Sequence, residues 1–212
     1  MIEDVEIIQI NTDGIMIAID DSQEPDVDEI NRQWCEDFSL NLEADKIKAI
    51  YQKDVNNYLA VGLGGKLHGK GDFIKIGLAE NPLGYDKNDF YIVSKALVDY
   101  FVHGTPVETT IRNEKDILKF QQICHASSKY SDVRHNDQSL QKTNRVYASK
   151  DESNGTIMKK SKKTGRWNKF ANCPEHCVVD NENKLTIDDI DVDWYIKLAK
   201  KRLKMFTEKE KK

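Results

Sequence analysis

Short apolar segments of two different periodicities, arranged without an internal repeat, constrain the fold of this chain more than any other feature of its sequence. Val and Ile dominate residues 5–10 and 15–19, and a turn with Gly14 separates the two runs, which predicts a β-hairpin. In residues 26–40 apolar side chains recur every three or four positions and acids crowd the first turn, which predicts a helix. Strands and helices are therefore mixed along the chain, and we expect an α+β fold.

The remaining segments continue this mixed order. The further predicted elements are strands over 47–52 and 57–63, a helix over 89–104 that ends at Gly104, a helix over 113–126 capped by Asn113, short strands within 130–187 (NRVYAS, CVVD and KLTI), and an amphipathic helix over 191–206. Aromatic side chains with helical spacing are expected in the core: Trp34, Phe38, Tyr100, Phe101 and Phe120.

Charge is distributed unevenly along the chain. The net charge is only -4, yet residues 1–46 hold 14 Asp or Glu and 2 Lys or Arg, and the remainder carries a net +8. Residues 142–169 alone hold nine Lys or Arg against Asp151 and Glu152. This asymmetry favours a metal or solvent at the acidic end and a polyanion along the basic part, with two merely solvated faces as the alternative.

The chain shows no sign of a membrane or secretory protein. No window approaches eighteen apolar residues and the first residues lack a signal-peptide pattern, so we expect a cytoplasmic location and no membrane partner. The four cysteines are too few and too scattered for a disulfide framework, so reduced thiols are expected. Cys173, His176 and Cys177 lie close together in sequence, but no second Cys or His pair follows, and zinc is not favoured.

The turn between the first two predicted strands holds a single acid, Asp13, within the letters NTDG. An unpaired buried charge is costly, so such an acid normally has a cation or a donor beside it. The surrounding IQINTDGI is similar to the third polymerase motif of family B DNA polymerases, Tyr-Gly-Asp-Thr-Asp-Ser at a strand-turn-strand. Asp13 matches the second acid of that motif, while Asn11 replaces the first acid and Gly14 replaces the serine.

Further segments resemble the same family in the same order. QKDVNNYLAV resembles its Lys-Lys-Arg-Tyr segment, which tracks the primer-template duplex, with Tyr58 in the tyrosine position and Asn56 and Asn57 in place of basic residues. GKGDF, residues 69–73, resembles the Lys-Gly segment that leads from the palm to the thumb in this family. KALVDYFVHGTPVETTI, NRVYASKD and WYIKLAKKRLKMF look like the thumb and C-terminal helix of phage-type members, and the stretch around Pro174 then becomes a tight thumb turn.

Two motifs of this family are absent from the sequence. The metal-binding Asp-x-x-Ser-Leu-Tyr-Pro pattern and the nucleotide-gripping Lys-x-x-x-Asn-Ser-x-Tyr-Gly pattern do not occur. The resemblance therefore implies the C-terminal portion of a DNA-directed DNA polymerase, a nucleotidyltransferase of DNA replication from a phage or prophage in a bacterial host. Residues 1–80 are then the last part of the palm, with an antiparallel hairpin and a helix, and residues 81–212 are a thumb of mixed helical and β structure.

The resemblance makes Asp13 both the catalytic residue and the metal ligand. Nucleotidyl transfer uses two divalent cations about 3.5–4 Å apart. Mg²⁺ takes oxygen ligands and is usually held by one or two carboxylates together with the substrate phosphates. We expect Asp13 to complete a Mg²⁺ site whose other acid belongs to a missing N-terminal polymerase portion, with deoxynucleoside triphosphates as substrates. The chain alone is then inactive.

Binding of primer-template DNA is the activity that this portion would keep by itself. Lys and Arg release counterions from phosphates whatever the base sequence. The predicted DNA contacts are Lys53, Tyr58, Lys66, Lys70, Lys159, Lys160, Lys162, Lys163 and Arg166. For the cluster at 159–166 a solvated hairpin is an equal alternative. A stand-alone, non-catalytic DNA-binding module derived from a polymerase also stays open, with Asp13 then only accepting hydrogen bonds in its turn.

Overall fold

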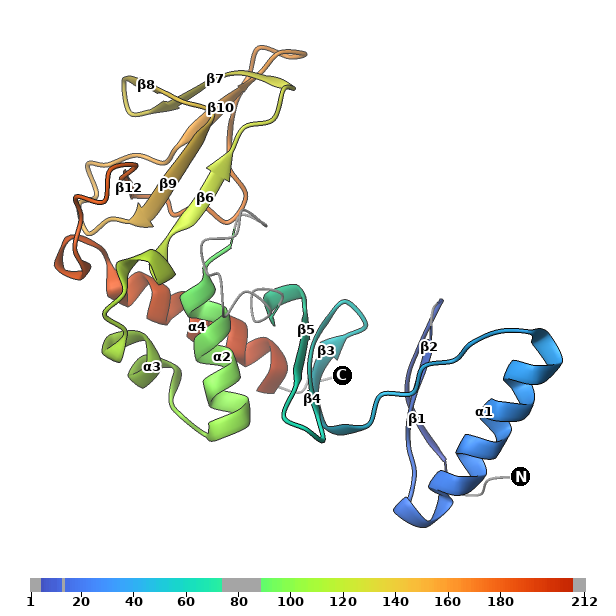
Figure 1. Cartoon of the computed structure of the whole chain (residues 1–212). Helices are drawn as coiled ribbons and strands as arrows, with labels where there is room; N and C mark the ends of the chain where they lie inside the picture. The colour runs from blue at the N-terminus through green and yellow to red at the C-terminus, as the bar shows by residue number, and fades with distance from the viewer. Residues whose placement is uncertain (1–4, 13, 74–88, 208–212) are drawn as a thin grey trace, which may run out of the picture.

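The computed structural model describes residues 5–12, 14–73 and 89–207 and has an α+β fold, as predicted (Figure 1). Its strands are β1 (Glu6–Asn11), β2 (Gly14–Ala18), β3 (Ile47–Asp54), β4 (Asn57–Gly62), β5 (Leu67–Lys70), β6 (Gln122–His125), β7 (Tyr130–His135), β8 (Gln138–Leu140), β9 (Thr143–Ala148), β10 (Met158–Ser161), β11 (Trp167–Lys169) and β12 (Cys177–Val179). Its α-helices are α1 (Glu24–Phe38), α2 (Tyr91–His103), α3 (Val107–Asn113) and α4 (Val192–Thr207). Short 3-10 helices are η1 (Asp21–Gln23), η3 (Ile117–Phe120) and η4 (Ile187–Asp189).

The N-terminal part consists of the predicted hairpin, β1–β2, and the predicted helix, α1. Asp20 begins the η1 turn that leads into α1, because its side chain accepts a hydrogen bond from the backbone N–H of Ser22. No residue of α1 is buried. Trp34 and Phe38 contact each other but are 43% and 60% exposed, so their prediction as core residues is wrong. Within the described residues, no element covers the apolar face that their helical spacing creates.

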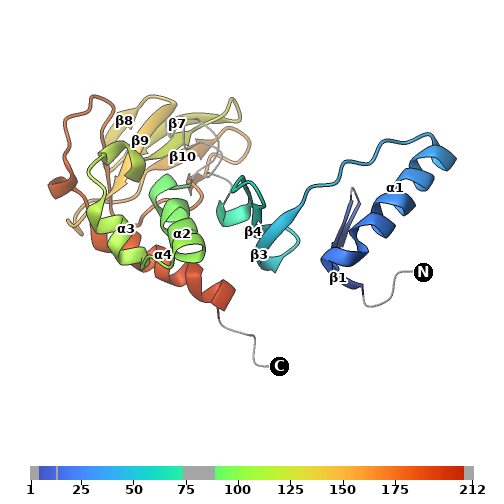
Figure 2. The same ribbon diagram turned by 60° about the horizontal axis from the view of Figure 1, so that its bottom comes forward.

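A three-stranded antiparallel sheet, β3–β4–β5, lies between α1 with its hairpin and the helices α2 and α4 (Figures 1 and 2). Its buried Leu59 belongs to one hydrophobic core with Phe73 and with residues of α2 and α4. The apolar face of β4 therefore packs on the helices. The predicted domain boundary after residue 80 falls within 74–88, outside the described residues.

The helices α2, α3 and α4 pack together around this core. Gly104 ends α2 with a left-handed backbone (φ 69°), and the apolar side of α4, including Tyr195 and Ala199, is buried, both as predicted. The predicted helix over 113–126 is wrong. Asn113 ends α3 rather than beginning a helix, and Cys124 lies in strand β6, which pairs with β9.

Two sheets form the remaining, β-rich part, with strand orders β12–β9–β6 and β11–β10–β7–β8. A second core packs between them and includes Cys124, Val133, Val146 and Phe170. NRVYAS and CVVD form strands as predicted, but KLTI does not. That segment stays a loop because the carboxylate of Asp180 accepts hydrogen bonds from its backbone N–H groups at Lys184 and Leu185, and from that of Glu182 just before it, at 2.8–2.9 Å.

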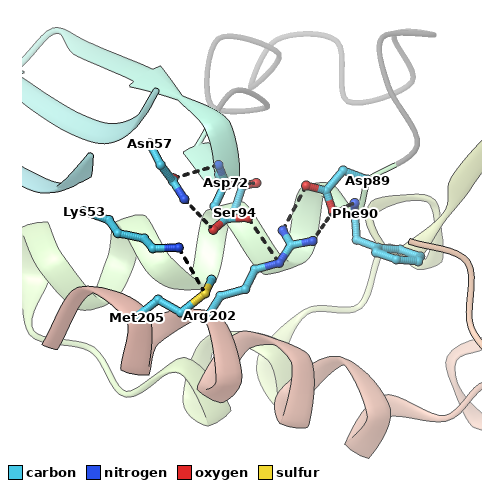
Figure 3. Close-up of polar contacts among 8 residues, drawn as sticks. All are labelled: Lys53, Asn57, Asp72, Asp89, Phe90, Ser94, Arg202 and Met205. Carbon is cyan, nitrogen blue, oxygen red and sulfur yellow. Dashed lines mark hydrogen bonds and ion pairs between the residues drawn. The ribbon is translucent and has the colours of Figure 1, made fainter. Parts of the chain in front are cut away.

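A buried ionic network joins the β3–β5 sheet to the helices (Figure 3). The guanidinium of Arg202, on α4, donates two hydrogen bonds to the carboxylate of Asp89, at 2.9 and 2.7 Å. Its Nε atom lies 3.3 Å from Oδ1 of Asp72, which follows β5. Asn57 also binds Asp72, and Ser94 donates to the Asp72 carbonyl. Arg202 therefore holds the end of the predicted GKGDF segment against α2 and α4.

Candidate nucleic-acid interface

The structure describes the hairpin that carries the predicted metal site. The hairpin β1–β2 is present, and Asn11 and Gly14 pair across its end. Asp13 lies outside the described residues. Among residues 5–12, 14–73 and 89–207, no group of three or more His, Cys, Asp or Glu side chains is placed to hold a metal ion.

Two of the predicted DNA contacts, Tyr58 and Lys70, lie side by side. They are directly opposite each other in the β4–β5 pair, and Gln52 of β3 is the other neighbour of Tyr58. Because neighbouring side chains along a strand point to opposite faces, Tyr58 lies on the face away from the core that buries Leu59. On that face Gln52 donates a hydrogen bond to Gln9 of β1, at 2.7 Å. Tyr58 and Lys70 are thus on the side of the sheet that contacts the N-terminal hairpin.

The structure separates Lys53 and Lys66 from this pair. The Nζ atom of Lys53 lies 3.7 Å from the sulfur of Met205 on α4 (Figure 3). Lys66 is exposed in the turn between β4 and β5, where its carbonyl accepts a hydrogen bond from Gly62. Lys53 therefore faces the helices, whereas Lys66 lies in the exposed turn between β4 and β5.

The other predicted contacts gather on the hairpin formed by β10 and β11. Lys162, Lys163 and Arg166 are exposed in its turn. The turn is closed by hydrogen bonds from Ser161 N–H to the Arg166 carbonyl, at 2.9 Å, and from Gly165 N–H to the Ser161 carbonyl, at 2.8 Å. Gly165 has a positive φ of 67°, a conformation that glycine adopts readily. Three cations are thus held on one tight turn.

The lysines of β10 are packed against aromatic rings. Lys159 places its ammonium 4.4 Å from the ring centre of Tyr130 and 4.6 Å from that of Phe170. Lys160 lies 5.9 Å from the ring centre of Trp167, its partner across the β10–β11 pair. Such contacts between a cation and a ring face are attractive and restrict the lysine side chain. Lys159 therefore belongs to the base of the hairpin rather than to its exposed tip.

Sequence reasoning missed Arg134 and Trp167. The guanidinium of Arg134, on β7, lies 4.1 Å from the ring centre of Trp167 on β11. The two residues are more than thirty positions apart in the chain and meet because β10 pairs with both β7 and β11. An alternation of apolar and polar side chains indicates a strand, but no local pattern predicts which strands pair.

The five hairpin cations, Lys159, Lys160, Lys162, Lys163 and Arg166, carry uncompensated charge. In the described part of the chain none of them forms an ion pair with a carboxylate, whereas Lys95, Lys119 and Arg202 do. Lys162, Lys163 and Arg166, which are exposed as well as unpaired, are available to an incoming polyanion. The β10–β11 hairpin, residues 158–169, is thus the strongest candidate interface, and we call it the basic hairpin.

No family model, curated protein or solved structure matches this chain. Across the described residues, none of the helices combines the length and the apolar character needed to cross a lipid bilayer.

Proposed function

We propose that the chain is the C-terminal palm and thumb portion of a DNA-directed DNA polymerase similar to family B, and that its own contribution is to hold primer-template DNA. The observation that carries the proposal is the basic hairpin, where three exposed cations share one turn without a carboxylate partner in the described residues. Phosphates of a duplex are the polyanion that such a turn suits, because Lys and Arg bind them whatever the base sequence.

The packing behind the turn supports this role. Lys159 and Lys160 lie on the rings of Tyr130, Phe170 and Trp167, so the strand that carries the turn is anchored to the β-rich core. A cation on an anchored turn loses less conformational freedom on binding than one on a disordered segment. The hairpin thus presents its charges at a defined place.

The catalytic part of the proposal rests on Asp13. Asp13 would share two Mg²⁺ ions with an acid of the missing N-terminal portion, and the ions would activate the primer 3'-hydroxyl and neutralise the leaving pyrophosphate. Tyr58 and Lys70, on the sheet face that meets the hairpin through Gln52 and Gln9, would position the primer strand nearby. This part is tested by mixing the chain with a candidate N-terminal portion and measuring primer extension for Asp13→Asn.

Exposed apolar side chains on the β1–β2 hairpin and α1 support the proposal that another polymerase portion binds to the N-terminal part. Ile7, Ile10 and Ile15 of the hairpin are exposed, as are Trp34 and Phe38 of α1. A two-stranded hairpin is marginally stable by itself, and contiguous exposed apolar side chains mark surfaces that bind another polypeptide. A polymerase portion that adds strands to this hairpin would bury them.

The DNA-binding part is tested by the dependence of affinity on salt. Binding of a duplex is measured between 50 and 200 mM salt for the unaltered chain and for Lys162→Gln, Lys163→Gln and Arg166→Gln combined. If each cation contacts one phosphate, the slope of log K against log salt falls by about 2.7, because each contact contributes about 0.9.

A matched control removes three other exposed cations: Lys115→Gln, Lys197→Gln and Lys201→Gln. The change in net charge is the same, but these residues lie outside the basic hairpin. The control should leave the slope nearly unchanged. Equal losses in both variants would show that only overall charge matters, and an unchanged slope in the hairpin variant would contradict the proposal.

A further inference from the structure

The four-stranded sheet β11–β10–β7–β8 has one face in the core and one face open to solvent. Val133 of β7 is only 1% exposed and belongs to the second hydrophobic core. Its neighbours along the strand, Asp132 and Arg134, therefore point to the opposite side, and both are exposed. We call this side the outer face. It belongs to the end of the molecule opposite α1 (Figures 1 and 2).

Strand register brings an aromatic ring and three cations together on the outer face. Met158 of β10 is paired with Arg134 of β7 and with Lys169 of β11, and Lys160 is paired with Trp167. Directly paired residues place their side chains on the same side of a sheet. The outer face thus presents Trp167 with a cation on each of three neighbouring strands.

Trp167 and Arg134 form a stacked pair that is free to bind a ligand. The guanidinium carbon of Arg134 lies 4.1 Å from the ring centre of Trp167, and Lys160 places its ammonium 5.9 Å from the same centre. Arg134 is exposed, and within the described residues it forms no hydrogen bond or ion pair, so its N–H donors are available. Nucleic-acid bases stack on aromatic rings and on planar guanidinium groups.

The charge of these strands complements a nucleic-acid backbone. Residues 130–140 and 158–169 hold seven Lys or Arg and two Asp, Asp132 and Asp137. Lys169 lies 3.6 Å from Glu175, but the two side chains are 50% and 80% exposed, and such surface pairs are weak. The sheet therefore carries a net positive charge that attracts phosphates.

We propose that the outer face binds single-stranded DNA, with one base stacked on the Trp167–Arg134 pair and the flanking phosphates bound by Lys160 and by the exposed turn of the basic hairpin. A duplex keeps its bases inside the helical stack, so only an unpaired strand offers a base to this pair. The inference rests on the proposed function in taking DNA as the polyanion. It adds that the unpaired template strand beside the primer-template duplex is the part that the sheet holds.

The experiment compares an unpaired strand with a duplex on the full chain. Binding of a short fluorescein-labelled oligothymidylate and of a blunt duplex is measured by fluorescence anisotropy at several salt concentrations. Trp167→Leu should lower the affinity for oligothymidylate by roughly 5- to 150-fold, the effect of losing one stacked base, and should leave duplex affinity nearly unchanged. The salt slope should also stay unchanged, because this substitution removes no charge.

A second variant keeps the charge and removes only the planar group. Arg134→Lys should weaken oligothymidylate binding and leave duplex binding unchanged, because an ammonium cannot stack as a guanidinium does. Trp34→Leu is the control for the loss of a tryptophan, since Trp34 is 43% exposed on α1, and it should change neither affinity. Urea midpoints that match the unaltered chain would show that the variants fold.

The outcomes separate this inference from the proposed function. Oligothymidylate binding that is unchanged in Trp167→Leu or in Arg134→Lys overturns the inference, as does an equal loss of duplex binding in either variant. Duplex binding that still depends on Lys162, Lys163 and Arg166 would leave the proposed function standing in those cases. A chain that binds oligothymidylate through Trp167 but does not bind a duplex would support the inference and contradict the proposed function.

Discussion

Replacing Arg202 by methionine tests whether the buried ionic network holds the sheet β3–β5 on the helices. The side chain of Arg202 is only 8% exposed, and those of Asp89 and Asp72 are 11% and 17% exposed. Methionine fills a similar space but leaves both carboxylates without their cation. Removing one partner of a buried ion pair costs about 3–5 kcal/mol, because the remaining charge is buried and uncompensated.

The contacts that remain place the expected loss near the lower end of this range. Asp89 keeps a hydrogen bond from the backbone N–H of Phe90, at 2.8 Å, and Asp72 keeps one from the side chain of Asn57, at 3.1 Å. We therefore expect the free energy of unfolding to fall by about 3 kcal/mol for Arg202→Met. A domain is stable by about 5–15 kcal/mol, so this is a large share.

The assay is urea unfolding of the full chain, followed by far-UV circular dichroism. With a slope of about 2 kcal/mol per molar urea, a loss of about 3 kcal/mol lowers the midpoint by about 1.5 M. Arg112→Met is the control, because Arg112 binds Glu108 and Asp193 on the surface and its side chain is half exposed. Such surface pairs contribute little, so its midpoint should move far less.

A double variant refines the interpretation. Adding Asp89→Asn to Arg202→Met removes one of the two unpaired charges, and we expect it to recover part of the lost stability. The reasoning is refuted if Arg202→Met and Arg112→Met have the same midpoint, or if the double variant is less stable than Arg202→Met alone.

Two further predictions concern single positions. Gly71→Ala should destabilise the chain clearly more than Gly104→Ala: both glycines have a positive φ, but only at Gly71 would the new Cβ lie 2.7 Å from Oδ1 of Asn57, and the comparison of urea midpoints fails if the two variants are alike. Burial raises the pKa of Asp180, but hydrogen bonds from three backbone N–H groups outweigh this effect, so the pKa is lowered. The stability that this carboxylate contributes is therefore present above the unfolded pKa of about 3.9 and is lost as the pH falls. Asp180→Asn should therefore reduce the loss in the free energy of unfolding at acidic pH. An unchanged loss in urea titrations from pH 7 to pH 2 would contradict this.

Local patterns were sufficient for many elements of the fold. The hairpin β1–β2, the end of α2 at Gly104 and the buried side of α4 follow from features within a few residues of each position. The predicted helix over 113–126 was wrong. The sequence ILKFQQIC is compatible with a helix, but in the structure its first half forms a short 3-10 helix and its second half pairs with the distant strand β9. Once β9 pairs with this segment, Cys124 and Gln122 point into buried surroundings with a period of two.

Some features of the candidate site were likewise predictable from local sequence, and others were not. The cations of the basic hairpin are close in sequence, so their grouping on one turn was predictable. The pairing of Tyr58 with Lys70 required the β4–β5 register, and the contact of Lys53 with Met205 required the packing of α4 on the sheet. The spacing of the cysteines did not predict that Cys124, Cys173 and Cys177 belong to one hydrophobic cluster.

By itself, the sequence determined the α+β class, the charge of each segment and the helices whose apolar side repeats with the helical period, because these depend on neighbours along the chain. Only the tertiary structure decided which strands pair, which aromatic rings receive a cation and which cysteines share a core. Those contacts join residues tens of positions apart, and their geometry is set by strand register and by the packing of the core, neither of which a local pattern contains.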